Sequence, residues 1–171
     1  MNNSLTDIIS EKLEIVFCGI NPGLKSALDG HHFSGRSNRF WRVLHLSGFT
    51  PHEIEARNDR TILEFGLGLT TAVERPTARA DELSKEEFSA ALAVFREKMK
   101  TYKPRYIAFL GKSAYVGFFG KKNIAWGIQD DIFEGCKVWV LPNPSGLNRG
   151  FSLSGLVAAY GEMRLYGNEL N

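Results

Sequence analysis

Short apolar runs alternate along the chain with longer segments in which apolar residues recur at helical spacing. The short runs are typical of strands and cover residues 15–19, 66–71, 106–110, 128–133 and 137–141. Helical spacing predicts helices over residues 1–13, 39–47, 57–65, 113–119 and 152–166, and one more from Ser84 onward. Because strands and helices alternate, we expect an α/β fold, a three-layer α/β/α sandwich around a mostly parallel central sheet.

The boundaries of some elements have clear local signals. Ser84 and Glu87 have the spacing of a capping box at the start of a helix. Glu134 and Gly135 predict the turn of a hairpin between the last two strands. Residues 28–40 are polar and have little periodicity, so we expect a functional loop there.

The first predicted strand runs into a stiff turn made of Asn21, Pro22 and Gly23. Pro22 fixes its own φ and favours an extended backbone at Asn21, while Gly23 permits conformations that other residues avoid. In α/β proteins ligands bind at the carboxyl ends of parallel strands, and a stiff turn there fixes the direction of the Asn21 amide. We therefore expect the chemistry of the protein at this turn.

The composition agrees with one globular domain over residues 1–171. The chain is 43% hydrophobic and 12% aromatic, which is enough for a sizeable core. No run approaches the roughly 18 apolar residues of a membrane span, and the N-terminus does not resemble a signal peptide, so we expect a cytoplasmic protein. Cys18 and Cys136 are then expected to be small buried hydrophobes. A formal charge of +2 neither requires nor excludes a polyanionic partner.

The first turn is a poor match to a phosphate-binding loop. Such a loop needs Gly, Lys and Ser or Thr in succession, whereas Leu24 separates Gly23 from Lys25. A plain turn at the end of a strand is the other structural alternative for this motif taken alone.

A second turn of the same kind follows the last predicted strand. Residues 141–150, LPNPSGLNRG, again place Asn and Pro after an apolar run and continue with a leucine, Leu147. A leucine at the tip of a Gly-flanked loop is often buried under its own loop. An apolar tip beside an arginine is also what a wedge between DNA base steps requires. The motif by itself leaves both interpretations open.

The polar loop contains two adjacent histidines, His31 and His32. Two histidines without a nearby cysteine or carboxylate cluster do not predict a metal site, so we expect solvated loop residues and no metal. Six basic residues are candidate phosphate contacts if they share a face: Arg36, Arg39, Arg75, Lys112, Lys121 and Lys122.

Five motifs together resemble a known enzyme family. They are GINPGL (19–24), SNRFW (37–41), LT with V-x-RPT (69–77), LGKSAY (110–115) and LPNPSGLNR (141–149). In this combination, over nearly the whole chain, the sequence resembles the mismatch-specific uracil-DNA glycosylases, the bacterial relatives of thymine-DNA glycosylase. The resemblance implies a compact α/β/α fold and hydrolysis of the bond between a flipped-out uracil and its deoxyribose, without metal or cofactor. It also implies a monomer whose partner is double-stranded DNA with G:U mismatches.

The resemblance assigns roles to individual residues. Asn21 is expected to hold the attacking water, Phe33 to stack on the extruded base, and the backbone near Ile20 and Gly23 to contact that base. Further substrate contacts are expected from Ser26, Thr71 and Asn143. The loop that enters the DNA helix and contacts the widowed guanine is expected to contain Gly146, Leu147, Asn148 and Arg149.

The residue types agree with these roles. An amide such as Asn21 orients water but does not accept its proton, so we expect weaker chemistry than in a glycosylase with an acid there. Thr71 stands where relatives have a lysine or an asparagine, which leaves the preferred lesion and opposing base open. Asn148 stands where relatives vary, which leaves the geometry of the wedge open. We expect a monofunctional glycosylase acting on uracil and ethenocytosine-type lesions. The alternatives are a lesion-sensing DNA-binding module with little or no turnover and a small-molecule nucleotide hydrolase.

Overall fold

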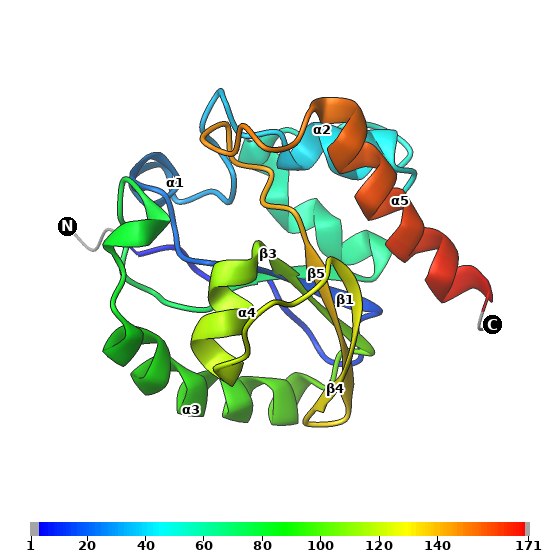
Figure 1. Cartoon of the computed structure of the whole chain (residues 1–171). Coiled ribbons are helices and arrows are strands. Elements are labelled where there is room, and N and C mark those ends of the chain that lie inside the picture. The colour runs from blue at the N-terminus through cyan, green and yellow to red at the C-terminus, as the bar shows by residue number, and fades with distance from the viewer. Residues whose placement is uncertain (1–3, 170–171) are drawn as a thin grey trace.

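The computed structural model describes residues 4–169 and centres on a five-stranded sheet (Figure 1). In chain order the strands are β1 (Ile15–Gly19), β2 (Leu67–Thr71), β3 (Tyr106–Leu110), β4 (Gly127–Phe133) and β5 (Cys136–Leu141). Their order across the sheet is β2-β1-β3-β5-β4. The pairs from β2 to β5 are parallel, and β4 is antiparallel to β5. The prediction of a mostly parallel sheet is confirmed.

Helices cover both faces of the sheet, as the α/β/α prediction requires. The helical elements, with η for a 3₁₀-helix, are α1 (Leu24–Asp29), α2 (Phe40–Leu46), η1 (Ala56–Phe65), η2 (Ala80–Glu82), α3 (Lys85–Tyr102), α4 (Lys112–Phe119) and α5 (Leu153–Glu169). α2 and α5 pack on one face, and α3 and α4 on the other (Figure 1). None of the described helices is long and apolar enough to cross a membrane.

Each face of the sheet has its own apolar core, because successive residues of a strand point to opposite sides. On the α2–α5 face, Phe17 of β1 packs against Phe40 and Tyr160, with ring centroids 5.5 Å and 6.4 Å away. On the α3–α4 face, the ring centroids of Phe95 and Phe109 are 5.8 Å apart. Strands buried on both sides have continuous apolar sequences, and every residue of β1 and β3 is buried.

Both cysteines lie in the core on the α3–α4 face. Cys18 is 0% exposed and Cys136 is 1% exposed, and neither forms a disulfide. Burial raises the pKa of both thiols, that of Cys136 to about 11, so both stay protonated at neutral pH. The prediction that they are buried hydrophobes is confirmed.

The start of α3 and the turn between β4 and β5 lie at the residues that the local sequence predicted. Ser84 caps α3: its Oγ accepts the N–H of Glu87 at 3.2 Å, and the Glu87 carboxylate accepts the N–H of Ser84 at 2.8 Å. The β4–β5 hairpin turns at Glu134 and Gly135, which both have positive φ. Both predictions are confirmed.

The predicted helix over residues 1–13 is wrong for residues 4–13, and residues 1–3 lie outside the described part of the chain. Ile8 instead forms an antiparallel bridge with Leu69 of β2, with N–O distances of 2.9 Å and 2.7 Å. Gly68 permits this close approach, since a Cβ there would lie 2.8 Å from Ile8 O. The segment covers the β2 edge of the sheet, but as extended chain.

The short helix α1 was not predicted. It begins after Gly23 and ends at Gly30, whose φ of 73° is favourable for glycine. Leu24 and Leu28 are 55% and 68% exposed, so the helix has no apolar stripe that faces the core. Without such a stripe, the periodic signal on which the other helix predictions depend is missing.

Candidate active site

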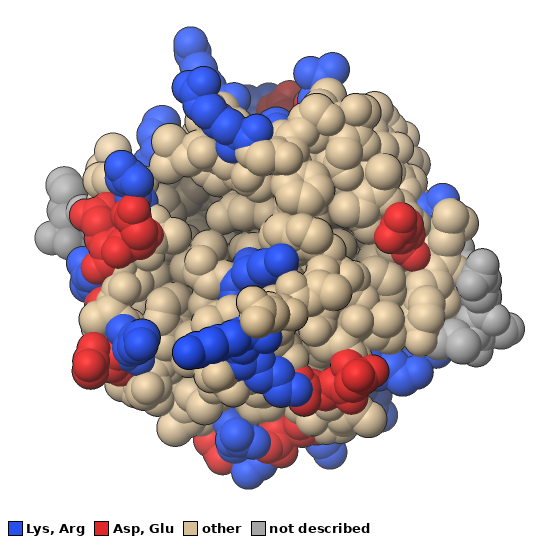
Figure 2. Space-filling view, in the orientation of Figure 1, with Lys and Arg blue, Asp and Glu red and all other residues tan. Residues whose placement is uncertain are grey.

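The carboxyl ends of β1, β3 and β5 converge at one edge of the sheet. Gly111, directly after β3, marks the meeting point: a Cβ there would lie 3.4 Å from Ile20 Cδ1 and 3.5 Å from Asn143 Cβ. The two Asn-Pro turns, after β1 and after β5, therefore lie on either side of the end of β3. On this side of the molecule the surface is hollowed beside α1, with Lys and Arg side chains above and below the hollow (Figure 2).

Asn21 has its amide orientation fixed by the segment between β2 and η2. Its Nδ2 donates to Arg75 O and to Thr77 Oγ1, both at 2.8 Å. Thr77 Oγ1 donates in turn to Arg79 O at 2.7 Å, so it accepts from Asn21. A carbonyl only accepts, so the group that faces Arg75 O is the NH₂ and not the oxygen. Asn21 Oδ1 therefore points away from this segment, and no described residue donates a hydrogen bond to it.

The same segment pairs with the backbone around Asn21. Val73 N donates to Ile20 O at 3.0 Å, and Thr77 N donates to Pro22 O at 3.2 Å. Thr77 also forms a parallel bridge with Gly23. The turn that was predicted to be stiff is thus hydrogen-bonded to the segment between β2 and η2 on both sides of Asn21.

Arg75 anchors this segment to α3. Its Nε donates to Glu87 Oε1 at 2.5 Å, and its Nη2 donates to Glu87 Oε2 and to Glu82 O, both at 3.1 Å. The bond from Arg75, together with the capping bond from Ser84, lowers the pKa of Glu87 to about 2. The guanidinium predicted as a phosphate contact is therefore engaged within the protein, and Glu87 stays an ionised, weakly basic carboxylate.

Phe33 lies over the end of β1 with one ring face covered. It is in the left-handed backbone region, with φ of 55°, which is rare for an aromatic residue. Its ring stacks on Phe40 at a centroid distance of 4.1 Å, and its Cζ lies 3.9 Å from a Cβ placed at Gly19. Ser26, which was predicted to contact substrate, is buried and accepts the N–H of Ser34 at 3.2 Å. The second ring face has no stacked ring among residues 4–169.

The two histidines before Phe33 have different environments. His32 is 2% exposed, its N–H donates to Asp59 Oδ2 at 2.9 Å, and its Nε2 lies 2.8 Å from Thr6 O. Trp41 Nε1 donates to His32 O at 2.9 Å, and His31 Nδ1 lies 3.3 Å from Asp59 Oδ1. Burial lowers the pKa of His32, which favours a neutral ring that donates to the Thr6 carbonyl. The expectation of two solvated histidines is wrong for His32, because the ring is part of the packing that holds the Phe33 loop.

The loop after β5 is ordered by its own side chains. Asn143 Oδ1 accepts the N–H of Ser145 at 2.9 Å, Asn148 Nδ2 donates to Asn143 O at 2.9 Å, and Ser145 Oγ accepts the N–H of Leu147 at 3.2 Å. Leu147 is 70% exposed at the tip, and Arg149 beside it is also exposed. The alternative in which Leu147 is buried under its own loop is therefore wrong.

Gly146 fits this loop against the SNRFW motif. A Cβ at Gly146 would lie 2.5 Å from Ser37 Cβ and 2.7 Å from Ser37 O, which is closer than real contacts permit. Two segments that are distant in the sequence and belong to different motifs are therefore in direct contact.

Some of the candidate phosphate contacts already interact with other side chains of the protein, and others do not. Lys121 pairs with Asp131 at 2.7 Å, and Lys112 Nζ lies 4.5 Å from the ring centre of Trp126. Within the described part of the chain, three basic residues of these motifs and loops are exposed without an ion pair: Arg36, Lys122 and Arg149.

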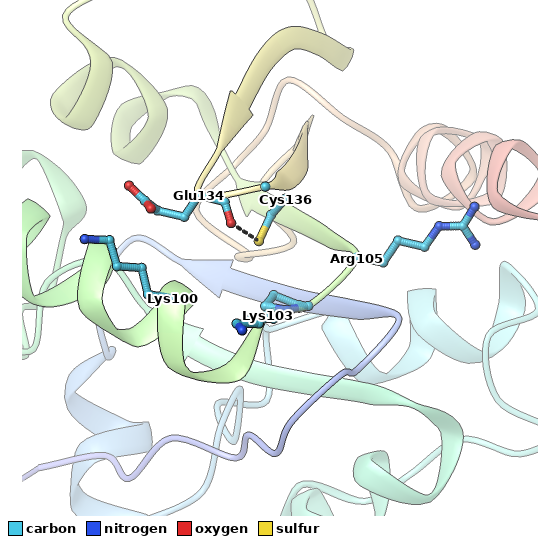
Figure 3. Close-up of a pocket in the computed structure, with 7 residues that line it drawn as sticks. Lys100, Lys103, Arg105, Glu134 and Cys136 are labelled. Carbon is cyan, nitrogen blue, oxygen red and sulfur yellow. Dashed lines mark hydrogen bonds between the residues drawn. The ribbon is translucent and has the colours of Figure 1, made fainter.

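Thr71 lies at the same sheet edge as Phe33. It pairs in register with Gly19, and its Cγ2 lies 3.9 Å from a Cβ placed there. It also lines a hollow of about 440 Å³ beside α3. Another hollow of about 520 Å³, lined by Lys103, Cys136 and their neighbours, lies at the amino ends of β3 and β5 (Figure 3). That hollow is at the opposite end of the sheet from Asn21.

Two residues that shape the site were not predicted. Thr77 belongs to the RPT motif, and the spacing of that motif does not indicate what the Thr77 hydroxyl binds. Asp59 is 3% exposed in η1, and nothing in its local sequence indicates that it binds a loop more than 25 residues earlier. A lone acid in a helical segment is ordinarily a solvated residue.

Comparisons with known proteins agree with the fold and identify the superfamily. The family model described as the Uracil DNA glycosylase superfamily matches residues 6–162. The solution NMR structure of a candidate uracil DNA glycosylase from Methanosarcina acetivorans superposes with a TM-score of 0.58 at 22% identity. The match covers 94% of this chain and 97% of that one. At this identity the structural likeness shows the fold alone.

Proposed function

Because this chain belongs to the Uracil DNA glycosylase superfamily, we propose that it removes uracil from DNA by hydrolysing the N-glycosidic bond. In finer detail, we propose a monofunctional enzyme that excises uracil mispaired with guanine in double-stranded DNA, and ethenocytosine-type lesions. The product is an abasic site, which begins base excision repair.

The observation that carries the proposal is the orientation of the Asn21 amide. Both N–H groups of Nδ2 have acceptors in Arg75 and Thr77, so Oδ1 is the atom left to accept a hydrogen bond from a water. The amide lies in the turn that follows β1, and the Phe33 ring lies over the end of the same strand. Asn21 is thus suited to hold the attacking water, and no rotation of the amide is needed before the reaction.

The departing base is the second chemical problem. Loss of uracil places negative charge on the base and leaves an oxocarbenium-like sugar, so the useful act is to stabilise the anion with preorganised donors. Asn143 Oδ1 is taken by Ser145 N–H, and Asn143 Nδ2 has no acceptor among the described residues. Asn143 lies across Gly111 from Ile20, and its Nδ2 is suited to donate a hydrogen bond to a base carbonyl at this edge.

Access to the base requires its extrusion from the duplex. Extrusion costs a few kcal/mol and costs least for mismatched or damaged bases, which by itself favours a G:U pair. We expect the ring face of Phe33 opposite Phe40 to stack on the extruded base, an interaction worth about 1–3 kcal/mol. Leu147, 70% exposed beside Arg149, is suited to fill the vacated space in the stack.

The test of the proposal is excision by an Asn21→Ala variant. Purified protein is incubated with end-labelled duplex containing G:U and then treated with alkali, which cleaves only at abasic sites. We expect the parent protein to yield cleaved product, and Asn21→Ala to lose about a hundredfold or more in single-turnover rate while it keeps its affinity for duplex DNA. Asn58→Ala, at an exposed position on η1, is the matched control.

Other outcomes select the alternatives. A parent protein that binds the G:U duplex but yields no alkali-labile product would be a lesion-sensing module. Excision by Asn21→Ala at the parent rate would show that another group holds the water. A protein that releases uracil from free nucleotides and ignores DNA would be a nucleotide hydrolase.

A further inference from the structure

Arg39, the residue before α2, binds the loop that carries Leu147 with its whole head group. Its Nη2 donates to Ser145 O and to Asn148 O, both at 2.9 Å. Its Nη1 donates to Phe151 O at 2.7 Å, and its Nε lies 3.4 Å from Pro144 O. The backbone N–H of Arg39 also donates to Pro144 O, at 3.0 Å. One side chain thus joins four carbonyls along eight residues of loop.

Among the described residues, Asn148 O and Phe151 O accept hydrogen bonds from the Arg39 side chain alone, whereas Ser145 O also accepts the N–H of Asn148 at 3.0 Å. A guanidinium presents up to five N–H groups in a rigid plane and accepts none, so it suits a set of convergent carbonyls. No described carboxylate forms an ion pair with Arg39, so the loop carbonyls are its main partners. On the same side, Gly146 lies directly against Ser37, two residues before Arg39. Residues of the SNRFW motif thus pack against the Leu147 loop and bind its backbone.

We propose that Arg39 is a positioning residue that holds the Leu147 loop in its DNA-penetrating shape before DNA is bound. This inference rests on the proposed function, in which Leu147 fills the space left by the extruded base. A loop already ordered in the free protein loses less conformational entropy when it enters the duplex, so more of the contact energy favours extrusion. Arg39 acts through the backbone of residues 144–151 and needs no contact with DNA.

The proposal differs from the sequence-based expectation that Arg39 contacts phosphate. Three of its nitrogens already donate to carbonyls, and the head group is only partly accessible. A phosphate contact contributes about one unit to the slope of log affinity against log salt concentration. We expect Arg39→Gln to leave that slope unchanged.

The test is a double-mutant cycle of Arg39 with Leu147 on a G:U duplex. Single-turnover excision is measured for the parent protein, Arg39→Gln, Leu147→Ala and the double variant, and base extrusion is followed by the fluorescence of 2-aminopurine beside the uracil. We expect Arg39→Gln to lose about tenfold in rate and in the extrusion signal. The double variant is expected to have the same excision rate as Leu147→Ala alone, because ordering the loop no longer affects extrusion once the Leu147 side chain is removed. Arg42→Gln, on the exposed side of α2, should behave as the parent protein.

Several results would overturn the inference. They are a double variant whose losses multiply, an Arg39→Gln variant with parental rate, and a salt slope reduced by about 1. Arg39→Lys keeps the charge but reaches fewer carbonyls, so its excision rate should resemble that of Arg39→Gln. It replaces Arg39→Gln in the same double-mutant cycle if the glutamine variant does not fold. Failure of the proposed function is distinct, since the parent protein would then show no excision at all.

Discussion

Replacing Thr77 by valine tests whether excision requires the hydrogen bond that the Thr77 hydroxyl accepts from the Asn21 amide. Valine has nearly the shape of threonine but has no hydroxyl, so it removes the acceptor of one Asn21 N–H and the donor to Arg79 O. The backbone contacts of Thr77 with Pro22 and Gly23 do not involve the side chain and should persist. Thr77 is 5% exposed, so the substitution is not expected to touch DNA.

The size of the effect follows from the hydrogen bonds that are lost. Asn21 keeps its bond to Arg75 O, so its amide is loosened and not freed. A net hydrogen bond is worth about 0.5–1.5 kcal/mol, and a loss of 1.4 kcal/mol in transition-state stabilisation is about tenfold in rate. We therefore expect Thr77→Val to lower the single-turnover excision rate about two- to tenfold, much less than Asn21→Ala. Thr77→Ser keeps the hydroxyl and should keep most of the rate.

The assay compares the excision rate, the affinity for duplex DNA and the melting temperature. Thr50→Val is the matched control, because Thr50 is also buried and donates at 2.7 Å, to His52 O, away from Asn21. Both variants should lose similar stability, and only Thr77→Val should lose rate. Equal rates for Thr77→Val and the parent protein, or equal losses for both valine variants, would refute a positioning role for the Thr77 hydroxyl.

Two further predictions concern the loops on either side of the site. Leu147→Ala should reduce excision from duplex more than from single-stranded DNA, where no stack needs filling, and equal losses on both substrates would contradict a wedge. The pKa of His32 is lowered by burial, so the unfolded chain takes up a proton as pH falls below about 6.5 while the folded protein resists it. Stability should therefore be greatest above that pH and fall below it, measured as the melting temperature from pH 7.5 to 5.5. His32→Gln should flatten this dependence, and His52→Gln, at an exposed site, should not.

The strands could be predicted from the sequence because their signals are local. The strand predicted at residues 106–110 coincides with β3, and the capping box at Ser84 marks the start of α3. A buried parallel strand has a continuous apolar sequence, and a capping box involves residues three positions apart, so both are visible in short windows. α1 was missed for the converse reason: its exposed leucines give no periodic stripe.

The geometry of the site depends instead on contacts between distant segments. Asn21 is oriented by Arg75 and Thr77, which lie 54 and 56 residues later, and Arg39 binds carbonyls more than 100 residues later. The sequence indicates what an amide or a guanidinium is able to bond, but not which of its atoms are already occupied in the fold. That difference bears directly on the role proposed for Asn21. With its N–H groups engaged, it offers an acceptor to water, whereas the reverse orientation would offer donors and would suit the leaving base instead.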